Sequence, residues 1–175
     1  IYWEDQNVDG YEAYIIKFDR DGYKEWVELV GGSEEDFSGG LIIDNENNIY
    51  ITGGTQSNLD DQANFGNRDV FLSKLNSSGD KEWTRLLGTA SPYEYGNDLA
   101  IDSDGFIYLT GVLGGDIDNE ELNTVHDAFI TKYDSNGDKQ WLKFLNGSQK
   151  GDASSVAIDS CLLYTSPSPR DLSTS

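Results

Sequence analysis

The chain has 175 residues, of which 32 are acidic and 12 are basic, so its formal net charge is −20. Nucleic-acid binding needs a cationic surface and anionic membranes attract clusters of Lys and Arg, so this composition argues against both partners. No apolar run approaches the length of a membrane span, and we expect no membrane insertion. Such acidity is typical of a self-repelling surface in a salty or extracellular setting.

One segment occurs three times, at residues 12–31, 69–88 and 127–147. Each copy has the features of a β-hairpin: an outgoing strand rich in aromatic and β-branched residues, a turn that ends in glycine, and a returning strand with a tryptophan. The equivalent positions are 57 and 58 residues apart: Lys17, Lys74 and Lys132; Gly22, Gly79 and Gly137; Trp26, Trp83 and Trp141. Self-similarity at a fixed period indicates a repeat protein.

The turns have a defined chemistry. Each opens with Asp or Asn, whose side chain bonds the backbone ahead, and each closes with the repeated glycine, for which we expect a positive φ. A second hairpin alternates with the first, at 41–53 and 99–111, and in it Asn47 stands where Gly105 does. Because Asn is the next residue most tolerant of the left-handed conformation, we expect positive φ at both positions.

The two kinds of hairpin predict a specific set of strands. The expected pairs are 12–18 with 23–30, 40–44 with 48–53, 69–75 with 80–87, 98–102 with 106–112, and 127–133 with 138–145. Two hairpins make a four-stranded unit, and a β-solenoid is the alternative architecture, although its repeats are usually about half this length. We therefore predict an all-β fold: a β-propeller fragment of about two and a half to three four-stranded antiparallel blades.

The two kinds of hairpin, taken in order, form one longer motif. It reads D-A-F-x-x-K, a turn ending in glycine, W-x-x-x-L-x-G, and then A-I-D-x-D-G-x-I-Y-x-T-G. This pattern resembles the SBBP-type repeat of seven-bladed β-propellers and covers nearly all of residues 1–160. The resemblance implies a propeller of several blades, common in bacterial secreted or surface proteins. It implies no particular reaction, because propellers host unrelated functions.

The last residues of the chain differ in kind. The segment Cys161–Asp171 reads CLLYTSPSPRD, which resembles a translated transposase-type sequencing adapter. We therefore expect 1–160 to be a partial propeller and 161–175 to be a non-native tail. The Leu-Tyr-Thr run imitates the missing strand one residue early, which would turn its side chains to the wrong faces. Ladder pairing should end by Pro167, which has no amide hydrogen, and 168–175 should be irregular.

The repeated residues have structural and functional interpretations. The tryptophans could stack on a sugar or a flat cofactor, but we expect them to pack between blades. The lysines could line a central channel, but we expect each of them to pair with an acidic residue of its own blade, a pairing that contributes little when exposed.

The long connections at 55–68 and 114–126 are candidates for binding. Each is longer than most loops in compact domains, and we expect both to project from the sheets. Asp116, Asp118 and Glu120 offer three carboxylates of the kind that Ca²⁺ prefers, although a solvated polar loop is the alternative. The equivalent residues of the first connection are Asn58, Asp60 and Gln62.

The motifs point away from catalysis. The sequence has no Ser-His-Asp set, HExxH motif or glycine-rich phosphate loop, and its single cysteine belongs to the tail. We expect a non-catalytic module of a larger secreted or surface protein, without a resident cofactor, that binds protein or glycan and packs against the remaining blades of its propeller. The alternatives are a calcium-binding adhesin-type propeller and a quinoprotein-like dehydrogenase, whose blade motif resembles Gly79-Asp-Lys-Glu-Trp83.

Overall fold

A computed structural model describes residues 11–118, 120–121, 126–145, 151–159 and 163–167. This part of the chain is all-β, as predicted, and contains no helix that could cross a membrane. Its strands are β1 (Tyr14–Phe18), β2 (Lys24–Leu29), β3 (Asp36–Ile43), β4 (Ile49–Thr55), β5 (Asp69–Leu75), β6 (Lys81–Leu87), β7 (Tyr95–Ile101), β8 (Ile107–Leu113), β9 (Asp127–Tyr133), β10 (Lys139–Phe144), β11 (Ala153–Ile158) and β12 (Leu163–Pro167).

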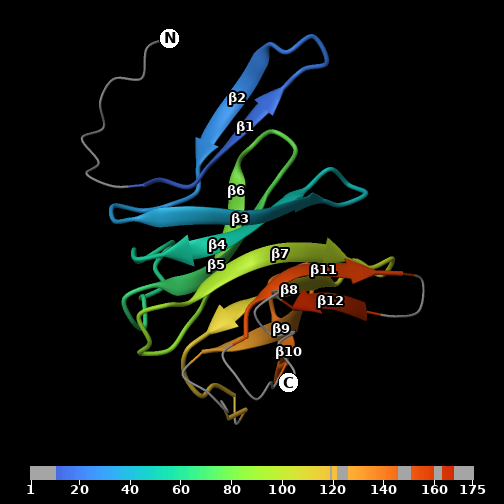
Figure 1. Cartoon of the computed structure of the whole chain (residues 1–175). Helices are drawn as coiled ribbons and strands as arrows, with labels where there is room; N and C mark the ends of the chain where they lie inside the picture. Colours follow the sequence, from blue (N-terminus) through green and yellow to red (C-terminus); the bar gives the residue numbers. More distant parts are fainter. Residues whose placement is uncertain (1–10, 119, 122–125, 146–150, 160–162, 168–175) are drawn as a thin grey trace.

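The strands form four antiparallel sheets that follow one another in chain order (Figure 1). Two are complete four-stranded sheets, β3-β4-β5-β6 and β7-β8-β9-β10, and they lie between the hairpins β1-β2 and β11-β12. All five predicted strand pairs are confirmed. The edge strands β3 and β7 begin earlier than predicted, at Asp36 and Tyr95.

The sheets are out of phase with the repeats of the sequence. Each complete sheet joins the second hairpin of one repeat to the first hairpin of the next, because β4 pairs with β5, and β8 pairs with β9. The β4–β5 register runs without a shift from Ile49 opposite Leu75 to Thr55 opposite Asp69. The long connections therefore join strands within one sheet, and the connections between sheets are short.

The hairpin turns share one hydrogen-bonding pattern. In the third copy, Oδ1 of Asp134 accepts hydrogen bonds from the backbone N–H groups of Asn136 and Asp138, at 2.9 and 3.0 Å. Asp19, Asp44, Asn76 and Asp102 accept the same two bonds in their own turns. The predicted positive φ is found at all five positions: Gly22, Asn47, Gly79, Gly105 and Gly137.

The hydrophobic core lies between the sheets. One cluster joins β1-β2 to the first complete sheet and includes Ile15 and Phe71. The largest cluster joins the two complete sheets and includes Leu72 and Leu109, and a third places Val156 of β11 against the second sheet. Each sheet therefore buries its faces against its neighbours, as in other repeat proteins.

A tryptophan of each repeat packs against the glycine turn of the next repeat. A β-carbon placed on Gly79 would lie 3.1 Å from Cδ2 of Trp26, and one on Gly137 would lie 3.1 Å from Cε3 of Trp83. Arg85 joins the second contact, because its Nε donates to the carbonyl of Gly137 at 2.9 Å. The turn glycine thus has a positive φ and also leaves room for an indole ring.

The last strand keeps the register of its equivalents, so the predicted inversion of faces is wrong. Tyr164 lies opposite Ala157, as Tyr108 lies opposite Ala100. The segment between the two strands is one residue shorter than in the equivalent hairpin: Ile158 pairs with residue 163, whereas Ile101 pairs with residue 107. The strand ends at Pro167, as predicted. Cys161 and 168–175 lie outside the described residues, and the origin of the tail stays a prediction.

The glycine turns provide a test of this packing. Gly105 has a φ of +84° with no atom within 4 Å of its missing β-carbon, whereas Gly137 has a φ of +79° and contacts Trp83 and Arg85. Replacement by Val should cost about 1–2 kcal/mol of unfolding free energy at either position, because the left-handed backbone is strained. Gly137→Val should cost ~1–3 kcal/mol more, from overpacking.

Urea denaturation of the two variants, followed by circular dichroism, measures this difference. Equal losses in Gly105→Val and Gly137→Val would contradict the packing of Trp83 on the turn.

Candidate functional site

The repeated Lys and Trp residues belong to a row of side chains across each complete sheet. In the first sheet the row is Ile42, Tyr50, Lys74 and Trp83, one residue from each strand in direct register. The Tyr50 and Trp83 ring centroids are 6.1 Å apart, and Nζ of Lys74 lies 5.8 Å from the Tyr50 ring. The second sheet repeats the row with Ala100, Tyr108, Lys132 and Trp141.

The lysines pair with carboxylates of their own sheets. Lys17 contacts Glu25 at 2.8 Å, Lys74 contacts Glu82 at 2.9 Å, and Lys132 lies 3.9 Å from Asp102. Lys132 also lies over the ring of Phe106, with Nζ 3.7 Å from its centroid. The charges of Lys74 and Lys132 are thus placed beside aromatic rings and carboxylates of the same sheet.

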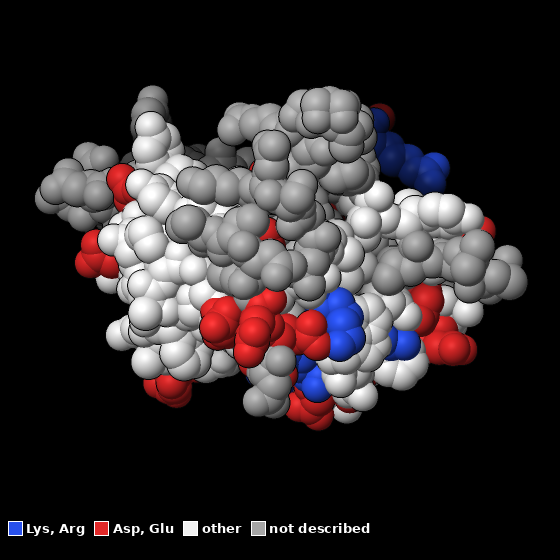
Figure 2. Space-filling model, turned by 60° about the horizontal axis from the view of Figure 1, so that its bottom comes forward, with Lys and Arg blue, Asp and Glu red and all other residues white. Residues whose placement is uncertain are grey.

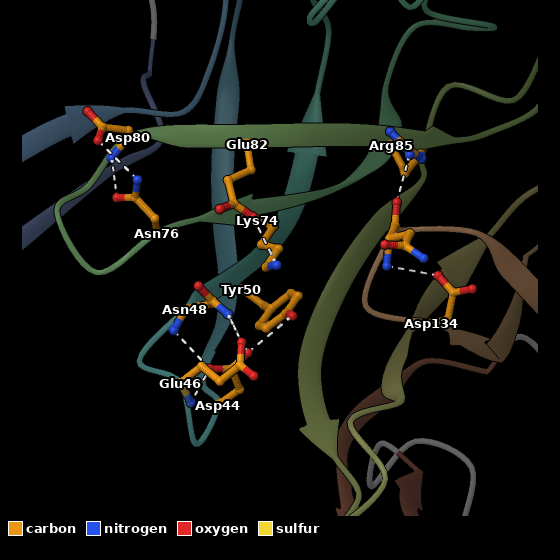
Figure 3. A network of polar contacts seen from close by, with 11 residues as sticks. Asp44, Glu46, Asn48, Tyr50, Lys74, Asn76, Asp80, Glu82, Arg85 and Asp134 are labelled. Atoms are coloured by element: carbon orange, nitrogen blue, oxygen red, sulfur yellow. Dashed lines mark hydrogen bonds and ion pairs between the residues drawn. The ribbon is translucent and has the colours of Figure 1, made fainter.

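A groove opens between the two complete sheets, where their turns come together. It encloses about 320 Å³ and is lined by Asp44 and Glu46 from the turn after β3, and by Asp102 and Asp104 from the turn after β7. Tyr50, Lys74 and Ser135 also line it. We call it the acidic groove. Figure 3 shows the side chains on its β3–β4 wall, with Lys74 directed toward Glu82.

Asp44 is the best-connected carboxylate of the acidic groove. Its Oδ2 accepts hydrogen bonds from Nδ2 of Asn48 at 2.9 Å and from the Tyr50 hydroxyl at 3.3 Å. Burial alone would raise the pKa of Asp44, but the hydrogen bonds from Asn48, Glu46 and Tyr50 outweigh it and lower that pKa. Burial, together with the charge of Asp44, raises the pKa of Tyr50. The pair is therefore a carboxylate held by a neutral phenol.

The same arrangement recurs one repeat later, where the Tyr108 hydroxyl donates to Oδ2 of Asp102 at 3.1 Å. Because Lys74 is already paired with Glu82, the carboxylates of the acidic groove outnumber the positive charge available to them. The groove is thus an anionic recess beside an aromatic ring. A cationic group is the chemistry that it suits best.

Two of the three calcium candidates pair with two different lysines. Oδ2 of Asp118 lies 2.5 Å from Nζ of Lys139, and Glu120 forms an ion pair with Lys143. Asp116 lies in the same connection. In the described part of the chain, no three acidic, His or Cys side chains form a group that could hold a metal ion.

The first long connection lies along the outer strand of its own sheet, so the expectation that it projects outward is wrong there. The Gln62 side chain donates to the carbonyl of Thr84 and accepts a 3.0 Å bond from the N–H of Leu86. Asp60 pairs with Lys81 at 2.8 Å, at the repeat position of the Asp118–Lys139 pair. The amide of Gln62 satisfies backbone groups at the edge of β6, which would otherwise attract another strand.

The charges of the surface are mixed where the structure is viewed from below. Figure 2 shows basic side chains next to acidic ones on this face of the molecule.

Buried carboxylates near the ends of the sheets were missed by the sequence interpretation. Asp36, Asp69, Glu94 and Asp127 are at most 1% exposed. Their spacing was the available signal, because Asp36 and Glu94 are 58 residues apart, as are Asp69 and Asp127. An acidic residue that recurs at a fixed repeat position is expected to make the same structural contact in each repeat.

These carboxylates hold the chain between strands. Glu94 accepts hydrogen bonds from the N–H groups of Thr89 and Gly114, at 2.7 and 3.0 Å, and Asp69 accepts one from the N–H of Phe65 at 2.8 Å. Burial raises the pKa of Glu94, and burial, opposed only in part by backbone hydrogen bonds, raises that of Asp69 to about 6. Oδ1 of Asp69 is buried without a hydrogen-bond partner.

The fold and the grooves define a class of protein: a β-propeller-type repeat scaffold. Residues 25–60 and 82–112 match the model of the SBBP beta-propeller repeat.

Two relatives align with more than half of the chain. The regulatory protein FlaEY of Caulobacter vibrioides is 33% identical over 113 residues, which cover 60% of this chain and 12% of FlaEY. The uncharacterized WD repeat-containing protein L264 of Acanthamoeba polyphaga mimivirus is 24% identical over 159 residues, covering 75% of this chain and 11% of L264. The chain thus spans about an eighth or less of each relative's length.

The raised pKa of Asp69 predicts a pH dependence of stability. Its carboxyl takes up a proton near pH 6 in the folded chain, against an ordinary value of 3.8, so the folded state is favoured as the pH falls through this interval. At pH 7 the buried charge should cost about 3 kcal/mol, from roughly 1.36 kcal/mol per pH unit. Asp69→Asn should therefore gain stability relative to wild type at pH 7 and lose this advantage near pH 4.

Urea unfolding of both proteins between pH 4 and pH 7.5 checks this expectation. Parallel stability curves for wild type and Asp69→Asn would show that Asp69 titrates normally. Glu34→Gln, which changes an exposed carboxylate, is the matched control.

The calcium hypothesis has a direct calorimetric test. Because Asp118 and Glu120 are engaged with lysines, Ca²⁺ would have to break two ion pairs, and we expect no saturable heat on titration of the chain with CaCl₂. A saturable heat that disappears in Asp118→Ala would contradict this expectation and establish the site.

Proposed function

We propose that this chain is a non-catalytic interaction module that binds basic segments of partner proteins in the acidic groove between neighbouring sheets. The observation that carries the proposal is the convergence of Asp44, Glu46, Asp102 and Asp104 on one recess, from one turn of each of two successive sheets. A single turn offers too few charges for this, so the site depends on the stacking of two repeats.

The groove also has a shape suited to an extended basic side chain. Lys and Arg combine a long apolar stem with a charged head, and the groove pairs Ile43 and Ile101 with its acidic rim. The charge of −20 would increase the rate at which a basic partner arrives, and this effect would decrease with ionic strength.

Repetition supports a scaffold with several equivalent sites. Each further pair of sheets would create another groove, and linked weak contacts add up to useful affinity. The relatives include a protein named as regulatory, which is compatible with binding. A secreted or surface location is part of the same proposal, supported by the resemblance and the acidic composition.

The test uses tetralysine as the probe and ¹⁵N NMR as the readout. We expect saturable shift changes confined to residues 44–50 and 102–105, and weaker binding at high salt. Glu46→Gln combined with Asp104→Asn should weaken the affinity about 3- to 10-fold, since exposed ion pairs contribute up to about 1 kcal/mol each. These side chains are exposed, and the turn hydrogen bonds are made by Asp44 and Asp102.

The matched control removes two exposed carboxylates elsewhere, Asp21→Asn with Glu34→Gln, and should leave the affinity unchanged. Equal weakening of the affinity by both double variants would mean that overall charge, and not the groove, attracts tetralysine, and would overturn the proposal. Saturable binding of cellotetraose in the groove, without binding of tetralysine, would assign the site to a glycan.

A further inference from the structure

The repeated lysine has a different acidic partner in each of the two complete sheets. In the first sheet Lys74 pairs with Glu82 of β6 at 2.9 Å. In the second sheet Nζ of Lys132 lies 3.9 Å from Oδ2 of Asp102, the residue that opens the turn after β7. Asp102 is the repeat equivalent of Asp44, which lies in the acidic groove. The same lysine position is thus directed to the outer strand in one sheet and to the turn in the other.

The first cause of this difference is a change from Glu to Gln. Gln140 stands 58 residues after Glu82, at the same repeat position. Its amide donates to Oδ2 of Asp134 at 3.3 Å and to the carbonyl of Asp138 at 2.9 Å, so it is neutral and bonded to its own turn. Lys132 therefore lacks the carboxylate that holds Lys74.

The second cause is a change from Asn to Phe. Nδ2 of Asn48 donates to Oδ2 of Asp44 at 2.9 Å, and this is the oxygen whose equivalent in Asp102 is approached by Lys132. Phe106 replaces Asn48 in the second sheet and cannot donate such a bond. Its ring instead lies under the lysine, with Nζ 3.7 Å from the centroid, a contact that attracts a cation. Lys132 thus shows, within the chain itself, an ammonium group held between an aromatic ring and the turn carboxylate.

We propose that Glu82 is a positioning residue of the acidic groove: it holds Lys74 away from Asp44 and so leaves Asp44 free for a basic ligand. The identity of the ligand rests on the function proposed above, whereas the positioning of Lys74 does not. The groove is then asymmetric, because Asp102 already has Lys132 beside it. A ligand ammonium should therefore bind on the wall that carries Asp44 and Glu46.

Lys74 is close enough to the groove to compete with a ligand. It lines the groove, and its side chain is only 13% exposed. Its Nζ lies 5.8 Å from the Tyr50 ring, whose hydroxyl donates to Asp44. Figure 3 shows Lys74 between Glu82 and the Tyr50 ring, with Asp44 at the hydroxyl end of that ring. Once released from Glu82, the lysine charge would stay in the recess and neutralise the carboxylates that the ligand needs.

The test measures tetralysine binding to the whole chain by ¹⁵N NMR. Glu82→Gln should weaken the affinity about 3- to 5-fold, the scale of one exposed ion pair. Glu25→Gln is the matched control, because it removes the same charge from the same repeat position and frees Lys17, which lies outside the acidic groove. Glu25 and Glu82 are 42% and 41% exposed, and the control should change the affinity less than about 2-fold.

A double-mutant cycle shows whether Glu82 acts through Lys74. In a Lys74→Met background, which keeps most of the apolar stem, Glu82→Gln should no longer weaken the affinity. Equal weakening by Glu82→Gln and Glu25→Gln would assign the effect to overall charge and overturn the proposal. The same weakening with and without Lys74 would overturn it as well, because Glu82 would then act directly.

The pKa of Asp44, followed by ¹³C NMR of its carboxylate, tests the inference without a ligand. A lysine that moves toward Asp44 favours the charged form, so Glu82→Gln should lower this pKa by about 0.5 pH unit, which corresponds to a 3-fold change in proton affinity. The shift should be absent in the Lys74→Met background. An unchanged pKa in Glu82→Gln would overturn the inference about Glu82, whereas failure of tetralysine to bind the wild-type chain would overturn the proposed function alone.

Discussion

The packing of a tryptophan against the glycine turn of the next repeat is the contact on which the rest of the structure depends. It places Trp26 on Gly79 and Trp83 on Gly137, and Arg85 reinforces the second contact through the carbonyl of Gly137. The same glycine must have a positive φ and must lack a side chain toward the indole. Two independent demands on one position explain why the turn and the tryptophan recur together.

This contact makes neighbouring sheets interdependent. The large apolar side chains lie at the boundaries between sheets, so an isolated sheet would expose one of its faces. The buried carboxylates hold the connecting segments at the ends of the strands, and the raised pKa of Asp69 shows that this comes with an electrostatic cost. The acidic groove follows from the stacking, because it is bounded by turns of two successive sheets.

The local structure could be predicted from the sequence, because hairpin turns have strong chemical signals. Asp or Asn followed by glycine, or by Asn47 in one case, predicted the five hairpin turns, but not the left-handed Asp60, Asp61 and Asp118 of the long connections. The phase of the sheets could not be predicted, since two alternating hairpins can be joined in either order. From the sequence, Gln62 belonged to a connection expected to project from the sheet, and Asp36 and Glu94 were not singled out. Gln62 bonds the backbone of Leu86, 24 residues along the chain, and Glu94 bonds that of Gly114, 20 residues along the chain, and only the repeat spacing hinted at these roles.

Nuclear Overhauser spectroscopy tests the stacking most directly. The Hα protons of Gly79 and Gly137 should give cross-peaks with the indole protons of Trp26 and Trp83, because each pair is in van der Waals contact. Assigned spectra with both sets of cross-peaks would establish that each tryptophan lies on the turn of the following repeat. Spectra in which both are missing, with the rings instead close to the turns of their own hairpins, would contradict the account.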